Sequence, residues 1–83
     1  MPSLTLYQFT DCPFCAKVRA ALGELGLAYE KVDVSRDWND SFRKELEKKS
    51  KIRSIPLLKV DDKYIGESVN IVRYLEKNFE NKN

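Results

Sequence analysis

The 83-residue chain contains no histidine, two cysteines, one tryptophan and only three residues each of glycine and proline. Without histidine, a Ser-His-Asp triad, a Cys-His pair and any metal site with an imidazole ligand are excluded. Few glycines and prolines, together with 42% hydrophobic and 34% charged residues, exclude a disordered or low-complexity chain. We therefore expect a single folded domain over residues 1–83, too short for a two-domain enzyme.

Charge and hydrophobicity argue against two kinds of partner. Fifteen Lys and Arg residues stand against thirteen Asp and Glu residues, far from the basic excess typical of nonspecific nucleic-acid binding. No apolar run approaches the roughly 18 residues of a membrane span, and residues 1–7 lack the features of a signal peptide. We therefore expect a cytoplasmic monomer that binds neither nucleic acid nor membrane.

The pattern of apolar and turn-forming residues predicts seven elements in the order β-α-β-α-β-β-α. The predicted strands cover residues 4–9, 29–35, 55–60 and 63–65, and the predicted helices cover residues 13–25, 38–50 and 67–79. This order indicates an α/β fold in which helices cover both faces of a four-stranded mixed sheet. The first strand is expected at the centre, so the segment after it lies at the crevice where such folds place their sites.

Two of the helices carry more specific expectations. Asp37 is placed to cap the second helix, in which Trp38, Phe42 and Leu46 recur every four residues. The last helix is expected to present one apolar face to the core. That face consists of Val69, Val72, Leu75 and Phe79.

A pair of cysteines, Cys12 and Cys15, follows the first predicted strand at the start of a helix. A redox cysteine must be exposed and ionised near neutral pH, because the thiolate attacks a disulfide. Cys12 faces unpaired N–H groups and the positive end of the helix dipole, so we expect its pKa to lie below the roughly 8.5 of a free thiol. Cys15, one turn further in, suits a resolving thiol, and Phe14 forms the rim between them.

Two other interpretations of this pair remain open. The cysteines could be small buried hydrophobic side chains, or they could hold part of a structural metal site. Two thiolates leave a zinc ion half coordinated, so a metal would require a second chain or an external thiol. We therefore expect no metal.

Two segments together resemble one family: Cys12-Pro13-Phe14-Cys15 after the first strand, and Ser54-Ile55-Pro56 before the third. The chain looks like a glutaredoxin of the thioredoxin fold over residues 4–79. The resemblance implies an enzyme that reduces protein disulfides or glutathione mixed disulfides through Cys12, with glutathione as reductant or co-substrate. It also implies that Pro56 is cis beside the dithiol and that the backbone of Ile55 pairs with the cysteine part of glutathione. A proline that merely begins a strand is the alternative.

The first departure from that family lies at Phe9, three positions before Cys12. Glutaredoxins commonly have Lys or Arg there to hold a glutathione carboxylate, so the cation must come from elsewhere. Lys51 or Arg53 could bind that carboxylate, and a solvated helix end is the alternative for both.

The second departure is Gly66-Glu67-Ser68, where many glutaredoxins carry two glycines. This segment is similar to the Glu-Ser segment of glutathione transferase N-terminal domains. The similarity implies that the hydroxyl and N–H of Ser68 bind the γ-glutamyl carboxylate at a helix start, while Glu67 faces the ammonium group. The alternative is structural: Ser68 is an N-cap and Glu67 is a first-turn acid.

Three competing functions follow from the same residues. A thioredoxin-like electron donor reduced by a flavoenzyme reductase is favoured by Phe9 and opposed by Glu67 and Ser68. An iron–sulfur carrier would bind its cluster through Cys12 of two chains with two glutathiones, and Cys15 and Phe14 argue against it. A transferase is disfavoured because its helical second domain has no room in these residues, unless the chain is a fragment of a longer protein.

Overall fold

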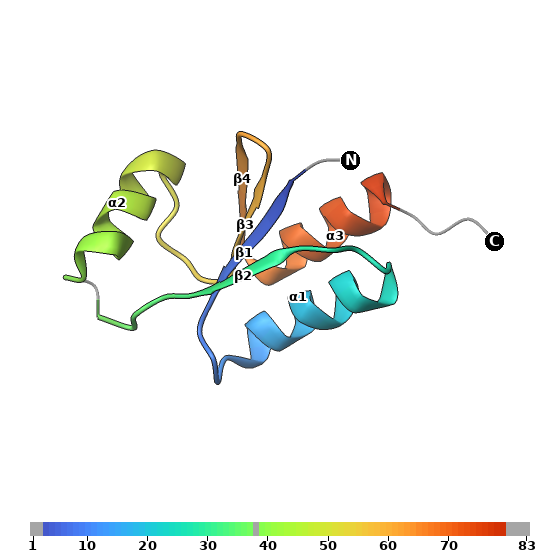
Figure 1. The fold of residues 1–83 in the computed structure, drawn as a ribbon, viewed down its shortest axis with the longest axis horizontal. Coiled ribbons are helices and arrows are strands. Elements are labelled where there is room, and N and C mark those ends of the chain that lie inside the picture. The colour runs from blue at the N-terminus through green and yellow to red at the C-terminus, as the bar shows by residue number, and fades with distance from the viewer. Residues whose placement is uncertain (1–2, 38, 80–83) are drawn as a thin grey trace.

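Figure 1 shows a computed structural model of the chain, which describes residues 3–37 and 39–79. The elements follow the predicted order. The strands are β1 (Leu4–Gln8), β2 (Glu30–Asp33), β3 (Leu57–Val60) and β4 (Lys63–Gly66), and the helices are α1 (Pro13–Glu24), α2 (Ser41–Ser50) and α3 (Ser68–Asn78). No helix within the described ranges is long and apolar enough to cross a membrane.

The four strands form one mixed sheet in the order β2-β1-β3-β4. β1 runs parallel to β2 and antiparallel to β3, and β4 pairs antiparallel with β3. Leu6 therefore lies opposite Lys31 on one side and Leu58 on the other. β1 is an interior strand, as predicted, and its carboxyl end leads directly into the cysteine pair.

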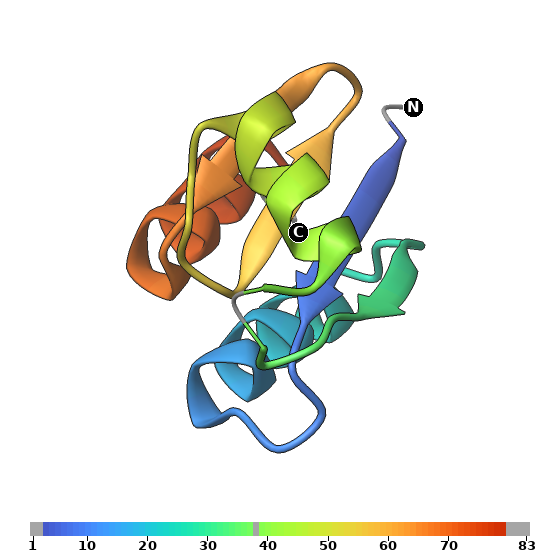
Figure 2. The same cartoon turned by 90° about the vertical axis from the view of Figure 1, so that its left-hand side faces the viewer.

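Helices cover both faces of this sheet, which confirms the predicted layers. α1 and α3 lie side by side on one face, and α2 lies on the other, where it faces the viewer in Figure 2. Successive side chains on a strand point to opposite faces of the sheet, so a strand can contribute residues to both cores. The larger core consists of Leu4, Leu6, Val18, Leu22, Leu58, Val60, Ile71 and Leu75, and the smaller one, under α2, of Val34, Leu46 and Leu57.

The predicted start of α2 is wrong by three residues. Asp40, not Asp37, is the N-cap, because its carboxylate accepts a hydrogen bond of 3.1 Å from the N–H of Arg43. Asp37 instead accepts from the N–H two residues further on and closes a turn. Either aspartate can cap a helix. The spacing of the aromatic residues favoured Asp37, and the start of α2 was therefore predicted too early. Trp38 lies outside the described residues.

The predicted inner face of α3 is only partly correct. Val69 is 59% exposed, whereas Ile71, which the prediction omitted, is fully buried. Leu75 is also fully buried, and Val72 and Phe79 pack at the edge of the larger core. Because Ile71 and Leu75 are four residues apart, they define the inner face, and Val69 lies too far around the helix to reach it.

Candidate active site

Cys12 is the N-cap of α1, immediately before Pro13, and its side chain is partly exposed. Desolvation acts to raise the pKa of Cys12. Hydrogen bonds from the N–H and the thiol of Cys15, and from the N–H of Phe14, outweigh it and favour the thiolate. The positive charge of Arg36 acts in the same direction, so the pKa of Cys12 is lowered, as predicted.

Cys15 lies in the opposite environment. Its side chain is fully buried, and its Sγ accepts a hydrogen bond of 3.4 Å from the backbone N–H of Phe9. Burial raises the pKa of Cys15 to about 11. The pair therefore combines a partly exposed cysteine whose pKa is lowered with a buried thiol that stays protonated near neutral pH. Among the described residues, no group of three or more Cys, Asp or Glu side chains is arranged to hold a metal ion.

A groove of about 280 Å³ brings together five of the residues that the sequence assigned to the site. They come from the start of α1, the loop before β3 and the start of α3: Phe14, Ile55, Pro56, Glu67 and Ser68. Phe14 is 55% exposed, so its ring forms an apolar wall beside the cysteines. The Ile55–Pro56 peptide bond is cis, as the resemblance implied.

Glu67 and Ser68 form the end of this groove at the start of α3. Glu67 is the N-cap, so the structural alternative that made Ser68 the N-cap is wrong. Ser68 is the first helical residue, and its hydroxyl has no hydrogen-bond partner within residues 3–37 and 39–79. The first N–H groups of α3 also lack intrahelical partners. A hydroxyl and several N–H groups are thus placed to bind an anion.

The backbone of Glu67 has an unusual conformation, with φ +67° and ψ 131°. L-residues other than glycine rarely adopt such angles, which cost about 1–3 kcal/mol. The Glu67 carbonyl accepts from the N–H of Ile71 at 3.0 Å, and its carboxylate accepts from the side chain of Asn70 at 3.4 Å. The Glu67 side chain is exposed and lines the groove together with Ser68.

Lys51 extends this site on the side of α2. It is the left-handed C-cap of α2, with φ +62° and ψ 22°. Together with Ser54, Gly66, Glu67 and Asn70 it lines a second hollow of about 330 Å³. Ser54 and Glu67 line both hollows, so the two adjoin. The structure therefore brings Lys51 to the predicted site.

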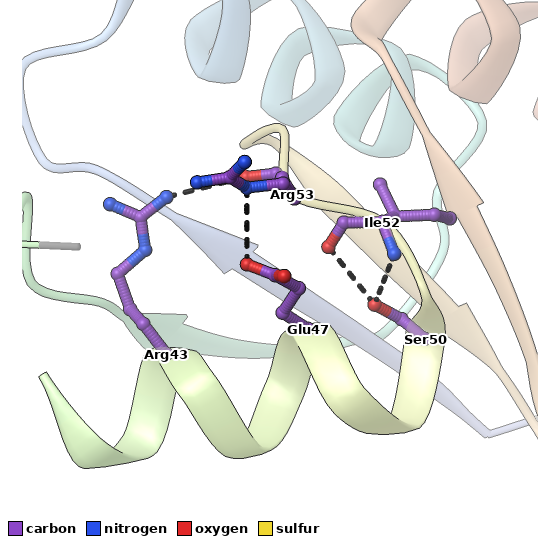
Figure 3. A network of polar contacts seen from close by, with 5 residues as sticks. All are labelled: Arg43, Glu47, Ser50, Ile52 and Arg53. Atoms are coloured by element: carbon purple, nitrogen blue, oxygen red, sulfur yellow. Dashed lines mark hydrogen bonds and ion pairs between the residues drawn. The ribbon is translucent and has the colours of Figure 1, made fainter. Parts of the chain in front are cut away.

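Arg53 belongs to a different network, which Figure 3 shows. Its Nε lies 3.2 Å from a carboxylate oxygen of Glu47, and its carbonyl accepts from Arg43 at 3.3 Å. Both contacts tie Arg53 to α2. Lys51 lines the hollow that shares Ser54 and Glu67 with the groove, whereas Arg53 lines a much smaller pocket that shares Ile55 with it.

Arg43 has a structural role that was not predicted from the sequence. It is only 6% exposed, and besides its contact with Arg53 it donates to the carbonyl of Ser35 at 3.1 Å. Phe42, which the four-residue spacing grouped with the buried Leu46, is 46% exposed. The spacing of Arg43 from Leu46 was the one sequence feature that could have indicated its burial, because residues three apart lie on the same face of a helix.

Arg36, in the loop after β2, was also missed. Its guanidinium carbon lies 4.5 Å from the centre of the Phe9 ring, and that of Arg43 lies 5.2 Å from the same ring. No spacing rule links residues 9 and 36, because only the β1–β2 pairing brings them together.

Comparison with known proteins agrees with this geometry. Residues 6–83 match the family model described as Glutathione S-transferase, N-terminal domain. Glutaredoxin 1 of Rickettsia conorii is 28% identical over 77% of this chain and 63% of its own length. Prostaglandin E synthase 2 of Danio rerio is 48% identical over 70% of this chain but only 14% of its own length.

Solved structures show the same relationship. The crystal structure of a glutathione transferase homologue from Drosophila mojavensis, with bound glutathione, has a TM-score of 0.82 and 27% identity. The match covers 95% of this chain and 36% of that one, so this chain spans less than two thirds of each of these three proteins. This chain belongs to the glutathione S-transferase N-terminal domain family and has its thioredoxin-like fold.

Proposed function

We propose that this chain is a glutathione-dependent thiol–disulfide oxidoreductase that reduces glutathione mixed disulfides or protein disulfides through Cys12 and Cys15. One observation carries the proposal: a partly exposed cysteine with a lowered pKa adjoins Phe14, which lines a groove with Ile55, Pro56, Glu67 and Ser68. An apolar wall beside an unpartnered helix N-terminus suits a small thiol with a carboxylate at one end.

The reaction proceeds by two thiol–disulfide exchanges. The Cys12 thiolate attacks the glutathione sulfur of a mixed disulfide, and the substrate thiolate leaves. Cys12 then carries glutathione through a new S–S bond. A second glutathione thiolate attacks the bound glutathione sulfur and releases oxidised glutathione and the Cys12 thiolate. Alternatively, Cys15 loses its proton and attacks Cys12, which forms an intramolecular disulfide and expels glutathione.

The groove suggests how the tripeptide lies. The γ-glutamyl carboxylate binds the Ser68 hydroxyl and the first N–H groups of α3, and Glu67 faces the ammonium group. The backbone of Ile55 pairs with the cysteine part of glutathione. Lys51 supplies the positive charge for the second carboxylate. The buried thiol of Cys15 has its pKa raised to about 11, which favours resolution by a second glutathione.

Turnover of a glutathionylated peptide tests this proposal. Reduced protein is mixed with the peptide and glutathione, and release of the free peptide is followed by chromatography. Cys12→Ser should abolish the protein-dependent rate, whereas Cys15→Ser should retain it, because this route needs one thiol. Reduction of a protein disulfide should suffer in both variants. If peptide release with the protein is no faster than with glutathione alone, the proposal is wrong.

The family match also favours a second function, the transfer of glutathione to an electrophile. Conjugation to 1-chloro-2,4-dinitrobenzene distinguishes it from disulfide reduction. Conjugation that persists in Cys12→Ser, without any peptide deglutathionylation by the wild type, would favour the transferase. Deglutathionylation that requires Cys12 would favour the oxidoreductase.

A further inference from the structure

The position three residues before Cys12 holds an aromatic ring instead of a cation. Phe9 lies at the carboxyl end of β1, and its backbone N–H donates to Sγ of Cys15 at 3.4 Å. The Phe9 backbone therefore adjoins the dithiol, and its ring packs at the edge of the smaller core. Its partner is Arg36, whose guanidinium carbon is 4.5 Å from the ring centre, well inside the range of a cation–π contact.

The loop that carries Arg36 is fixed from α2. Arg43 is buried and donates to the carbonyl of Ser35, the residue before Arg36, at 3.1 Å. The Arg43 guanidinium also contacts the Phe9 ring, at 5.2 Å. Phe9 and Arg43 therefore hold the start of this loop against the end of β1, so Arg36 has a defined place.

We propose that Phe9 positions Arg36 as the cation of the dithiol site, where its charge favours the Cys12 thiolate and attracts anionic reagents to it. The residue that replaces the usual cation thus recruits one from the next loop. The electrostatic influence of Arg36 on Cys12 supports this geometry. The inference rests on the proposed role of Cys12 as nucleophile, but alkylation tests it separately from disulfide reduction.

Several other groups surround Cys12 and act alongside Arg36. Within α1, the Cys15 thiol and the N–H groups of Phe14 and Cys15 favour the Cys12 thiolate. The carboxylates of Asp11, next in the chain, and of Glu67, across the groove, oppose the thiolate by their sign. None of these groups changes when Arg36 is substituted, so a change in reactivity reports the loss of its charge.

The pH dependence of Cys12 alkylation tests the proposal on the full chain. Iodoacetamide is neutral and reports the thiolate fraction, whereas iodoacetate is negative and also reports attraction to a nearby cation. Cys15 does not interfere near neutral pH, since its pKa is about 11. Arg36→Gln removes the charge, Arg36→Lys retains it, and Lys63→Gln removes an equal charge from the hairpin as the control.

Arg36→Gln should slow iodoacetamide alkylation at pH 6–7 by about three-fold, the size expected for one screened charge interaction near a surface. Arg36→Gln should slow alkylation by iodoacetate more, so the ratio of the iodoacetate rate to the iodoacetamide rate falls. Arg36→Lys should recover most of both effects, and Lys63→Gln should match the wild type. Salt at about 1 M should slow the wild type more than Arg36→Gln, because it screens the charge.

The role of Phe9 needs its own pair of variants. Phe9→Leu keeps an apolar side chain but removes the ring, and Phe9→Tyr keeps the ring. Phe9→Leu should therefore behave like Arg36→Gln, and Phe9→Tyr like the wild type. An unchanged pH profile in Arg36→Gln would overturn the proposal, and so would a wild-type reagent ratio in Phe9→Leu. Because Arg36 is exposed, its variant should fold, and a melting curve checks this.

Discussion

The backbone conformation of Glu67 can be tested by comparing the stabilities of two variants. Which of the two is more stable shows whether the backbone is strained, independently of the loss of the carboxylate. With φ +67° and ψ 131°, Glu67 occupies a region that suits glycine and is costly for every other residue. Glu67→Gly and Glu67→Ala both remove the carboxylate and its contact with Asn70. They differ only in a Cβ atom, so the comparison between them isolates the backbone.

The expected difference can be worked out from two opposing effects. Relief of the strained angles should stabilise Glu67→Gly over Glu67→Ala by about 1–3 kcal/mol. The greater freedom of glycine in the unfolded chain should reduce this by about 0.4–1 kcal/mol. The glycine variant should therefore be more stable by about 0.5–2 kcal/mol. At an unstrained position alanine would be the more stable of the two.

Urea unfolding followed by far-ultraviolet circular dichroism measures this difference, and the KM for the glutathionylated peptide at fixed glutathione concentration reports binding of its glutathione half. Glu67→Gly should unfold at higher urea concentration than Glu67→Ala, while both bind glutathione more weakly than the wild type. If Glu67→Ala is the more stable variant, the backbone at this position is not strained. If both variants bind glutathione like the wild type, the carboxylate does not contact it.

Three further predictions concern other parts of the site. Ser68→Ala should change stability by less than about 0.5 kcal/mol, since the hydroxyl is not a cap, but should weaken glutathione binding about 10 to 100-fold; a large drop in melting temperature with unchanged binding would contradict this. Lys51→Gln should weaken glutathione binding several-fold in low salt, whereas Arg53→Gln should leave binding unchanged and cost under about 1 kcal/mol, because its ion pair with Glu47 is exposed; equal binding losses in both would refute the distinction. The raised pKa of Cys15, about 11, means that the folded state favours the neutral thiol. Its contribution to stability is therefore present below about pH 8.5 and lost as the pH rises towards 11. Urea unfolding measures this in a Cys12→Ser background, with Cys15 either kept or replaced by Ala. As the pH rises over this range, the protein that keeps Cys15 should lose stability relative to the Cys15→Ala protein. A constant difference in stability would argue against the raised pKa.

Local sequence signals were sufficient for most of the fold. The apolar, β-favouring run that contains Leu4 and Leu6 marks β1, and Pro13 marks the start of α1. The cysteine pair lies where a thiolate-favouring helix start was predicted. These features depend on neighbours in the chain, so the sequence alone reports them.

Features that depend on contacts between distant segments were missed or misplaced. Asp37 and Asp40 are equivalent as potential caps, and only the packing of α2 chooses between them. Arg43 looks like one more charge on a solvated helix, yet it is buried because the carbonyls of Ser35 and Arg53 accept its hydrogen bonds. Arg36 reaches the site only through the fold, so its role has no signature in the sequence.

The fate of the two halves of a glutathionylated peptide tests the central claim most directly. Cys15→Ser is reacted with the peptide in the absence of free glutathione, quenched with acid, and its intact mass is measured. Cys12 should carry glutathione, with the free peptide released, because the groove binds the glutathione half and directs attack to its sulfur. A mixed disulfide between Cys12 and the peptide, or an unmodified Cys12, would contradict the proposed site.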